Sequence, residues 1–218
     1  MRRLPVPAPR RIIHPLRAVT SAVVSVQELP NDRRRVTIDH QPLNGVTPDM
    51  LLWWFENIAG TMPYDDGVVD RYLVWHPVDH IRWELARPSP GGGAQEGARF
   101  RIVEAFGARP EYYVDSVERV EKLDETGIRL VRRVLGVKVF ELSHTWSRCD
   151  GHTHYVSVME IGAVTRVFGL LNRYLTRSLF PARMADAWIV HNVEEVGLLE
   201  HILPALVPAV REAGSRET

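Results

Sequence analysis

A histidine and a glutamate stand four residues apart at His191 and Glu195, inside a segment that reads as a helix. Positions i and i+4 of a helix lie one above the other on the same face, so this imidazole and this carboxylate can converge on one point. Nitrogen and oxygen ligands of this kind suit Zn²⁺, with other divalent metals as alternatives. Val190 and Val193 indicate that the segment faces the interior, where an ionised Glu195 needs a partner. A surface histidine, or one hydrogen-bonded in the core, is the alternative.

A second pair of histidines, His76 and His80, lies far upstream in residues 75–80. Pro77 prevents a preceding strand from continuing as a regular ladder, so the pair is expected at the end of a rigid element. Either histidine is a candidate metal ligand. The alternatives are that His76 caps the turn and that His80 hydrogen-bonds Asp79 or a main-chain carbonyl. Asp79 is also a candidate for orienting a metal ligand.

The third candidate ligand is Glu104, an acid between apolar neighbours in a β-rich segment. Strand alternation puts Ile102 and Glu104 on one face, so a Glu104 that faces inward needs a cation or a metal. A salt bridge to Arg82 or Arg101 is the alternative interpretation.

The elements that must position these side chains begin with strands. Residues 19–29 and 34–38 are rich in β-branched side chains and predict an opening pair of strands. Residues 47–49, Thr-Pro-Asp, supply an N-cap, a proline at the first helical position and an acid in the first turn. They predict a helix that ends near Gly60.

The rest of the chain predicts an antiparallel meander followed by helices. The expected strands are 72–75, 81–85, 98–105, 112–122, 127–135, 137–146 and 152–161, and the expected helices are 163–179 and 183–210. Strand, helix, many antiparallel strands and a long final helix are the order of an α+β helix-grip fold. In such a fold a curved antiparallel sheet wraps around the C-terminal helix and encloses a cavity.

Composition favours one soluble domain. The chain has 218 residues, 45% of them hydrophobic, and its 27 basic residues equal its 27 acidic residues. We therefore expect no nucleic-acid partner and, without a long apolar run, no membrane partner. A single cysteine, Cys149, excludes an internal disulfide and favours a cytoplasmic setting.

Three segments are expected along the chain. Residues 1–18, with many arginines and prolines, predict an extended arm that packs loosely over the domain. Residues 19–212 form the single domain, and residues 213–218 are expected to be a disordered tail.

Four separated motifs resemble the family of 2,4-diacetylphloroglucinol hydrolases. They are TPDMLLWWF at 47–55, YLVWHPVDH at 72–80, IVE at 102–104 and HNVEE at 191–195. The resemblance spans most of the chain, and its specificity rests on the order of the motifs. It implies a helix-grip zinc enzyme that cleaves the carbon–carbon bond between an acyl group and a phenolic, polyketide-type ring.

The resemblance also implies roles for particular residues. His191, Glu195 and Glu104 would hold Zn²⁺, together with His80 or, as the alternative, His76. For the substrate, the resemblance implies contacts from Tyr72, Tyr155 and His144, which are the candidate catalytic residues. The asparagine that the family uses near its first metal histidine has no counterpart here.

The function expected is therefore a hydrolase of acylated phenolic or β-diketone compounds that uses metal-activated water. One alternative is a non-catalytic carrier of hydrophobic small molecules, because helix-grip cavities also suit binding without turnover. Another is a structural metal site whose coordination positions are all filled by protein. The sequence leaves the assembly open, with a homodimer as one alternative.

Overall fold

The computed structural model describes residues 3–216, with side chains up to residue 210. Within these residues, nine strands form one antiparallel sheet in the order β1-β2-β11-β10-β9-β8-β7-β6, with β3 paired to β11. The strands are β1 (Val23–Leu29), β2 (Arg33–Asp39), β3 (Leu43–Asn44), β6 (His80–Arg87), β7 (Arg99–Ala105), β8 (Tyr113–Asp124), β9 (Gly127–Val134), β10 (Val137–Cys149) and β11 (His152–Ile161). A separate hairpin pairs β4 (Thr61–Tyr64) with β5 (Gly67–Asp70).

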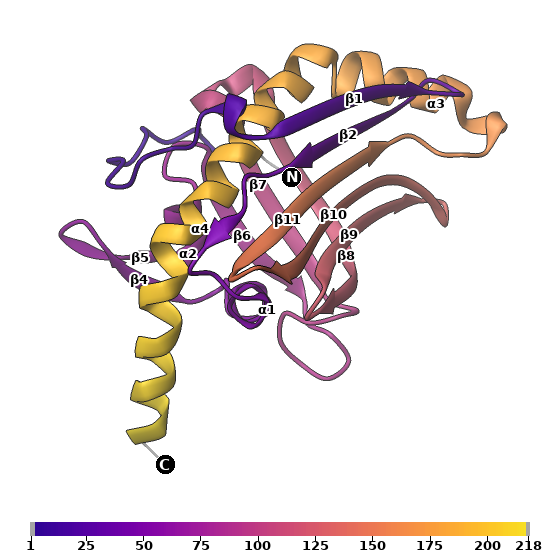
Figure 1. Cartoon of the computed structure of the whole chain (residues 1–218). Helices are drawn as coiled ribbons and strands as arrows, with labels where there is room; N and C mark the ends of the chain where they lie inside the picture. The colour runs from indigo at the N-terminus through magenta and orange to yellow at the C-terminus, as the bar shows by residue number, and fades with distance from the viewer. Residues whose placement is uncertain (1–2, 217–218) are drawn as a thin grey trace.

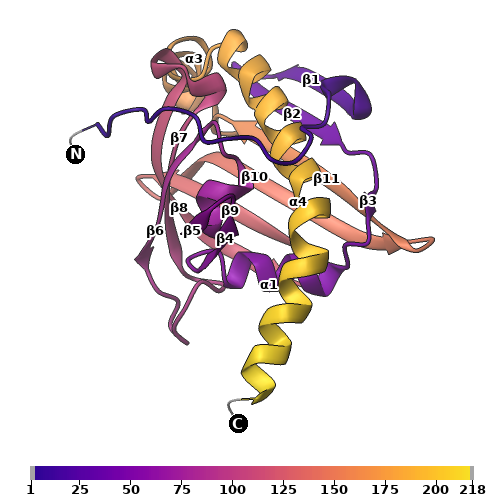
Figure 2. The same ribbon diagram turned by 90° about the vertical axis from the view of Figure 1, so that its left-hand side faces the viewer.

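The long C-terminal helix crosses one face of the curved sheet, as Figures 1 and 2 show. The α-helices are α1 (Pro48–Glu56), α2 (Arg71–Trp75), α3 (Gly169–Tyr174) and α4 (Ala182–Arg216). Short 3₁₀ turns cover Val19–Ser21, Phe106–Ala108, Pro110–Tyr112 and Arg166–Phe168, and a π-turn covers Leu175–Leu179. The chain therefore has the predicted helix-grip fold.

The core lies between the sheet and α4. Val196, Leu199 and Leu203 recur at helical spacing on α4 and are fully buried. They belong to one apolar cluster with Trp54 of α1 and Phe100 of β7. This burial fixes which face of α4 turns toward the sheet, and with it the direction in which the helix presents its polar side chains.

The start of α1 is as predicted. Thr47 is the N-cap, its hydroxyl accepts a hydrogen bond from the Met50 amide at 3.4 Å, and Pro48 takes the first helical position. The helix ends at Glu56, one turn before the predicted end at Gly60.

Two predicted elements differ in the structure. Residues 72–75, predicted as a strand, lie in helix α2, where Tyr72, Val74 and Trp75 are all buried. A strand exposes alternate side chains to opposite faces, whereas one helical turn turns these three toward the core. The predicted helix 163–179 is broken into a 3₁₀ turn, α3 and a π-turn.

The N-terminal arm packs across the domain without regular structure over residues 3–17 (Figure 2). The Arg10 amide donates to the Pro77 carbonyl at 2.9 Å, and Arg17 pairs with Glu200 of α4 at 2.7 Å. The first two residues of the predicted arm lie outside the described residues.

At the other end, α4 continues to Arg216 and so enters the segment predicted as a tail. The last two residues of that segment lie outside the described residues. Among the helices of residues 3–216, none combines the length and the apolar character needed to cross a bilayer.

Candidate metal centre

The register between β6 and β7 brings two of the predicted ligands together. His80 opens β6, and its Cα partner across the antiparallel ladder is Glu104, next to the end of β7. Directly opposed residues of such a ladder project to the same face of the sheet. The Nε2 atom of His80 lies 3.4 Å from Glu104 Oε1.

Helix α4 brings the other two predicted ligands to the same place. Glu195 Oε2 lies 3.6 Å from His191 Nε2 and 3.5 Å from His80 Nε2. Glu104 Oε2 lies 4.0 Å from His191 Nε2. The indole N–H of Trp75 donates to the Glu195 carbonyl at 2.8 Å, which ties α2 to α4 beside this cluster. Ligand atoms of His80, His191 and Glu195 therefore lie within 4.8 Å of one another, and Glu104 lies against both histidines.

Each imidazole is held by a partner on its far side. His80 Nδ1 lies 2.6 Å from the Tyr72 carbonyl oxygen, and His191 Nδ1 lies 3.0 Å from Asp79 Oδ2. A carbonyl and a carboxylate oxygen only accept, so both rings carry their proton on Nδ1 and keep a lone pair on Nε2. Nε2 of His80 is buried and has no hydrogen-bond partner among the described residues.

The two carboxylates are also oriented by neighbours. The Asn192 side-chain N–H donates to Glu195 Oε1 at 2.6 Å, and the Tyr72 hydroxyl donates to Glu104 Oε1. The alternative that Glu104 pairs with an arginine is wrong for both candidates. Arg101 pairs with Asp115 and Glu84, and Arg82 also pairs with Glu84.

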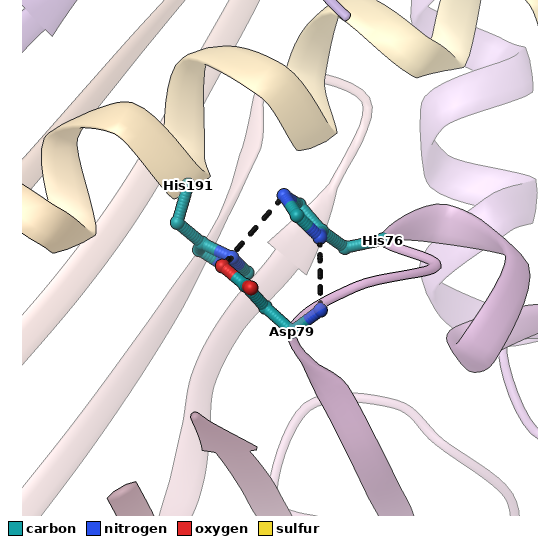
Figure 3. A group of neighbouring side chains, drawn as sticks. All are labelled: His76, Asp79 and His191. Carbon is teal, nitrogen blue, oxygen red and sulfur yellow. Dashed lines mark hydrogen bonds and ion pairs between the residues drawn. The ribbon is translucent and has the colours of Figure 1, made fainter. Parts of the chain in front are cut away.

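His76 makes a different set of contacts from His80. Its Nδ1 accepts a hydrogen bond from the Asp79 amide at 3.1 Å, so its Nε2 carries the proton and donates to Glu194 at 3.2 Å. Figure 3 shows the His76 ring beside the His191 ring, with Asp79 against both. Although ligand atoms of His76, Asp79 and His191 lie within 4.8 Å of one another, these contacts occupy both nitrogens of His76. The geometry favours His80 over His76.

In the absence of a cation, burial disfavours the charged forms of the side chains in this cluster. Burial and then the charge of Glu195 raise the pKa of Glu104 well above its usual range. Burial lowers the pKa of His80 and of His191, so both imidazoles are neutral near pH 7. For Asp79, burial acts to raise the pKa, but the hydrogen bond from His191 and nearby charge bring it below the usual value. Both imidazoles are thus in the protonation state that a metal requires, whereas Glu104 would have to lose its proton to bind one.

The three residues predicted to contact substrate lie around the same interior. The Tyr72 ring stacks on His80 with centroids 3.9 Å apart. Tyr155 is fully buried, and its hydroxyl has no partner among the described residues. His144 is 3% exposed, and burial lowers its pKa to about 4, against a smaller upward effect of Glu195.

Among the buried polar residues that sequence reasoning missed, three contact a candidate site residue or its partner, namely His40, Ser157 and Asn192. Ser157 Oγ lies 2.9 Å from His40 Nε2 and 2.9 Å from His144 Nδ1. Nothing in the sequence marks a serine within a strand, such as Ser157, as a site residue. Asn192 could have been found, because it directly follows the predicted ligand His191 on a helix that was expected to be buried.

The hollows at the surface beside the N-terminal arm are not part of this centre. One is lined by Arg3, Leu4, Pro5, Val6 and Pro110, and the other by Arg3, Tyr113, Asp115, Ser116, Val117 and Arg132. Among the four candidate ligands, Glu104 is the most exposed to solvent, with 13% of its side chain exposed. The enclosed cavity expected from the sequence stays a prediction.

Comparisons with known proteins give similarity of structure only. No protein-family model matches the sequence, and no curated protein matches it significantly. The solved structures that it resembles include protein Ms6760 from Mycobacterium smegmatis, at 12% identity and a TM-score of 0.42, over 80% of this chain and 97% of that one. Norcoclaurine synthase from Thalictrum flavum is 14% identical with a TM-score of 0.38, over 84% and 96%. Ara h 8.0201 is 9% identical with a TM-score of 0.41, over 74% and 97%.

Proposed function

We propose that this protein is a zinc-dependent hydrolase. Its reaction would cleave the carbon–carbon bond between an acyl group and a phenolic, polyketide-like ring or a β-diketone. The observation that carries the proposal is that ligand atoms of His80, His191 and Glu195 lie within 4.8 Å of one another, with Glu104 against both histidines. Each of these side chains has its far side held by another group. Such support of the ligands from behind is typical of metal sites in proteins.

The donor set fits Zn²⁺. Two neutral imidazoles and two carboxylates are hard and borderline ligands that zinc accepts, and a cation would offset the burial of both acids. The unpaired, buried Nε2 of His80 is the atom that most needs such a partner. Zn²⁺ held there would supply Lewis-acid activation of water and of a carbonyl oxygen.

The chain's own polar groups limit the substrate class. Cleavage of this bond leaves a carbanion, which is tolerable only where the charge is delocalised, as in a β-diketone or the keto form of a polyhydroxylated ring. The unpartnered hydroxyl of Tyr155 is available to donate a hydrogen bond to a substrate oxygen. The Tyr72 hydroxyl donates to Glu104. We therefore assign Tyr72 two roles, to orient Glu104 and to contact the substrate.

The first test compares two adjacent glutamates on α4. We expect Glu195→Gln to bind zinc at least tenfold more weakly and to lose hydrolysis, because the amide cannot supply an anionic ligand. Glu194→Gln is the matched control, since Glu194 contacts His76 rather than any of the four proposed ligands. Elemental analysis of the purified proteins and a panel of acylphloroglucinols and β-diketones are the measurements.

Equal zinc content and activity in wild type and Glu195→Gln would overturn the proposal. The competing function is a carrier of hydrophobic small molecules, which the apolar interior and the unpaired indole N–H groups of Trp54 and Trp146 also suit. A protein purified without zinc, but with a small molecule bound and no hydrolysis, would establish the carrier instead.

A further inference from the structure

The segment that follows β11 turns its apolar side chains toward solvent. A surface helix of a globular protein normally buries its apolar face. Over residues 164–179 the opposite holds, because the large apolar side chains are more than half exposed. They are Val164 (68%), Val167 (79%), Leu170 (85%), Tyr174 (56%) and Leu179 (53%). These five side chains, here called the apolar patch, are concentrated enough to mark an interaction surface.

Buried polar residues fix this orientation of the segment. The side chain of Asn172 in α3 is fully buried. It accepts a hydrogen bond from the Ala163 amide at 2.7 Å, and it donates to the carbonyls of Asn31 at 2.7 Å and Ala163 at 2.8 Å. Thr176, one turn later, is 3% exposed and donates to the Asn172 carbonyl at 3.0 Å. Residues two apart on a helix point to nearly opposite sides, so the burial of Asn172 turns Leu170 outward.

The apolar patch lies at one end of the sheet, where α3 stands beside the β1–β2 hairpin (Figure 1). Asn31, in the turn of that hairpin, donates to the Thr165 carbonyl at 3.1 Å. At the start of β10, the Val139 carbonyl accepts from the Gly162 amide at 2.8 Å. The β9–β10 turn reaches the same end and carries Leu135, which is 92% exposed. Apolar side chains from two separate segments are therefore presented together.

The charge around the patch is positive. Residues 161–185 contain four arginines and no acidic residue, although the whole chain is balanced. Arg177 pairs with Asp32 at 3.2 Å. Arg166, Arg173 and Arg183 are exposed and form no ion pair with a described residue. The surface is thus basic as well as apolar, and it calls for an anionic partner.

A second copy of this chain does not fit the patch. In a two-fold symmetric dimer the same surface meets itself, so arginines would face arginines, and like charges oppose such a contact. The two surface hollows beside the N-terminal arm are lined by other residues, so neither offers a partner protein an anchor on the patch. An anionic lipid surface needs no matching shape. Its headgroups attract arginine, and the boundary with the acyl chains accepts apolar side chains.

We propose that residues 164–179 attach this protein peripherally to an anionic lipid surface, with α3 lying against the headgroups. The inference is independent of the proposed hydrolase. A contact of this kind requires no spanning segment, so it is compatible with the absence of a bilayer-spanning helix among residues 3–216. It does revise the expectation, drawn from overall charge, of no membrane partner.

The test is flotation of the full chain with vesicles made of equal parts phosphatidylserine and phosphatidylcholine, compared with vesicles of phosphatidylcholine alone. We expect binding to the anionic vesicles, weakened by added salt because salt screens the arginines. Leu170→Asn should weaken this binding by about tenfold, since the side chain no longer enters the lipid boundary. Arg173→Gln should weaken it by about fivefold.

Two matched controls should bind as wild type does. Val68→Asn changes an apolar side chain that is 72% exposed on the β4–β5 hairpin. Arg148→Gln removes an exposed arginine at the opposite end of β10 from the patch. Circular dichroism of the four variants checks that each one folds, as expected for changes at exposed positions.

Several results would overturn the proposal. These are failure to bind anionic vesicles at low salt, equal binding to both kinds of vesicle, and binding that neither Leu170→Asn nor Arg173→Gln weakens. A dimer in light scattering that Leu170→Asn dissociates would assign the patch to a second copy instead. Binding of soluble polyglutamate without binding of vesicles would assign it to an acidic polypeptide.

Discussion

Each candidate imidazole donates its Nδ1 proton to an oxygen that can only accept, and this leaves Nε2 free. For His80 the oxygen is the Tyr72 carbonyl, and for His191 it is the Asp79 carboxylate. Asp79 is itself fixed, because the Ala108 amide donates to its other oxygen at 3.1 Å. At the scale of single residues, the metal proposal therefore depends as much on these supporting groups as on the ligands.

The residue Glu118, whose charge also acts to raise the pKa of Glu104, gives a stability prediction that is tested on the metal-free protein. It is 4% exposed on β8, and burial raises its pKa to about 7, while a hydrogen bond from Ser116 acts in the opposite direction. The folded state therefore holds the proton more tightly than the unfolded state, whose glutamate titrates near pH 4.5. Stability from this group is fully present below about pH 4.5 and is lost as the pH rises to about 7.

We expect Glu118→Gln to be more stable than wild type at pH 8, by roughly 3 kcal/mol at most, and nearly equal to it at pH 4.5. The amide keeps the shape of the side chain and removes the cost of burying the charge. Urea unfolding of both proteins between pH 4.5 and 8 measures the difference. A difference that stays constant over this range would contradict the assignment of a buried, strongly shifted Glu118.

Several site residues could be predicted from types and spacing, and others could not. The His191 and Glu195 pair follows from helical periodicity, and Glu104 follows from strand alternation. The choice between His76 and His80 needed the structure, because it depends on which nitrogen each backbone neighbour engages. His40 and Ser157 could not be found, since only the register of neighbouring strands brings them together.

At the scale of elements, the β6–β7 register decides whether a site can exist. His80 and Glu104 are opposed only because the ladder carries an irregularity between His80 and Arg82. A bulge of this kind shifts which side chains share a face, and it leaves no clear signal in composition. The prediction of a strand at 72–75 failed for a similar reason, because tertiary contacts of α2 with α4 outweigh local β propensity.

The contact between the arm and α4 offers a test of how these elements support each other. Gly197 lies on α4 beneath Arg17, and a Cβ added there would lie 2.5 Å from Cγ and Cδ of that arginine. Arg17 also pairs with Glu200 and donates to the Gln41 carbonyl at 2.7 Å. A larger residue at position 197 must therefore displace the Arg17 side chain.

We expect Gly197→Ala to destabilise the wild type by about 1 kcal/mol, because lost contacts of Arg17 exceed the gain in helix propensity. In an Arg17→Ala background the same change should stabilise by about 1 kcal/mol, as it does in an ordinary helix. Chemical unfolding of the four proteins of this double-mutant cycle gives both values. Equal stabilisation in the two backgrounds would show that the arm does not pack on α4.

At the scale of the whole molecule, the fold was the most predictable property. The order of opening strands, short helix, meander and long final helix indicated a helix-grip fold, and the sheet and α4 have that arrangement. Alternating and helical hydrophobic patterns carry this information locally. The contacts that α4 makes with β6, β7 and α2 are not local, and they assemble the candidate centre.

The fold alone does not select a function, since a helix-grip interior suits carriers and enzymes alike. The distinction depends on whether four side chains hold one ion. Four further points stay predictions: a cytoplasmic location, a small phenolic or β-diketone substrate, the absence of nucleic-acid partners, and the assembly state.

The most direct measurement is a crystal structure of the zinc-loaded protein with anomalous diffraction at the zinc edge. We predict one ion, bonded at about 2.0–2.2 Å to Nε2 of His80, Nε2 of His191 and oxygens of Glu104 and Glu195. An ion bound instead by His76 and Asp79, or no ion at saturating zinc, would contradict the account.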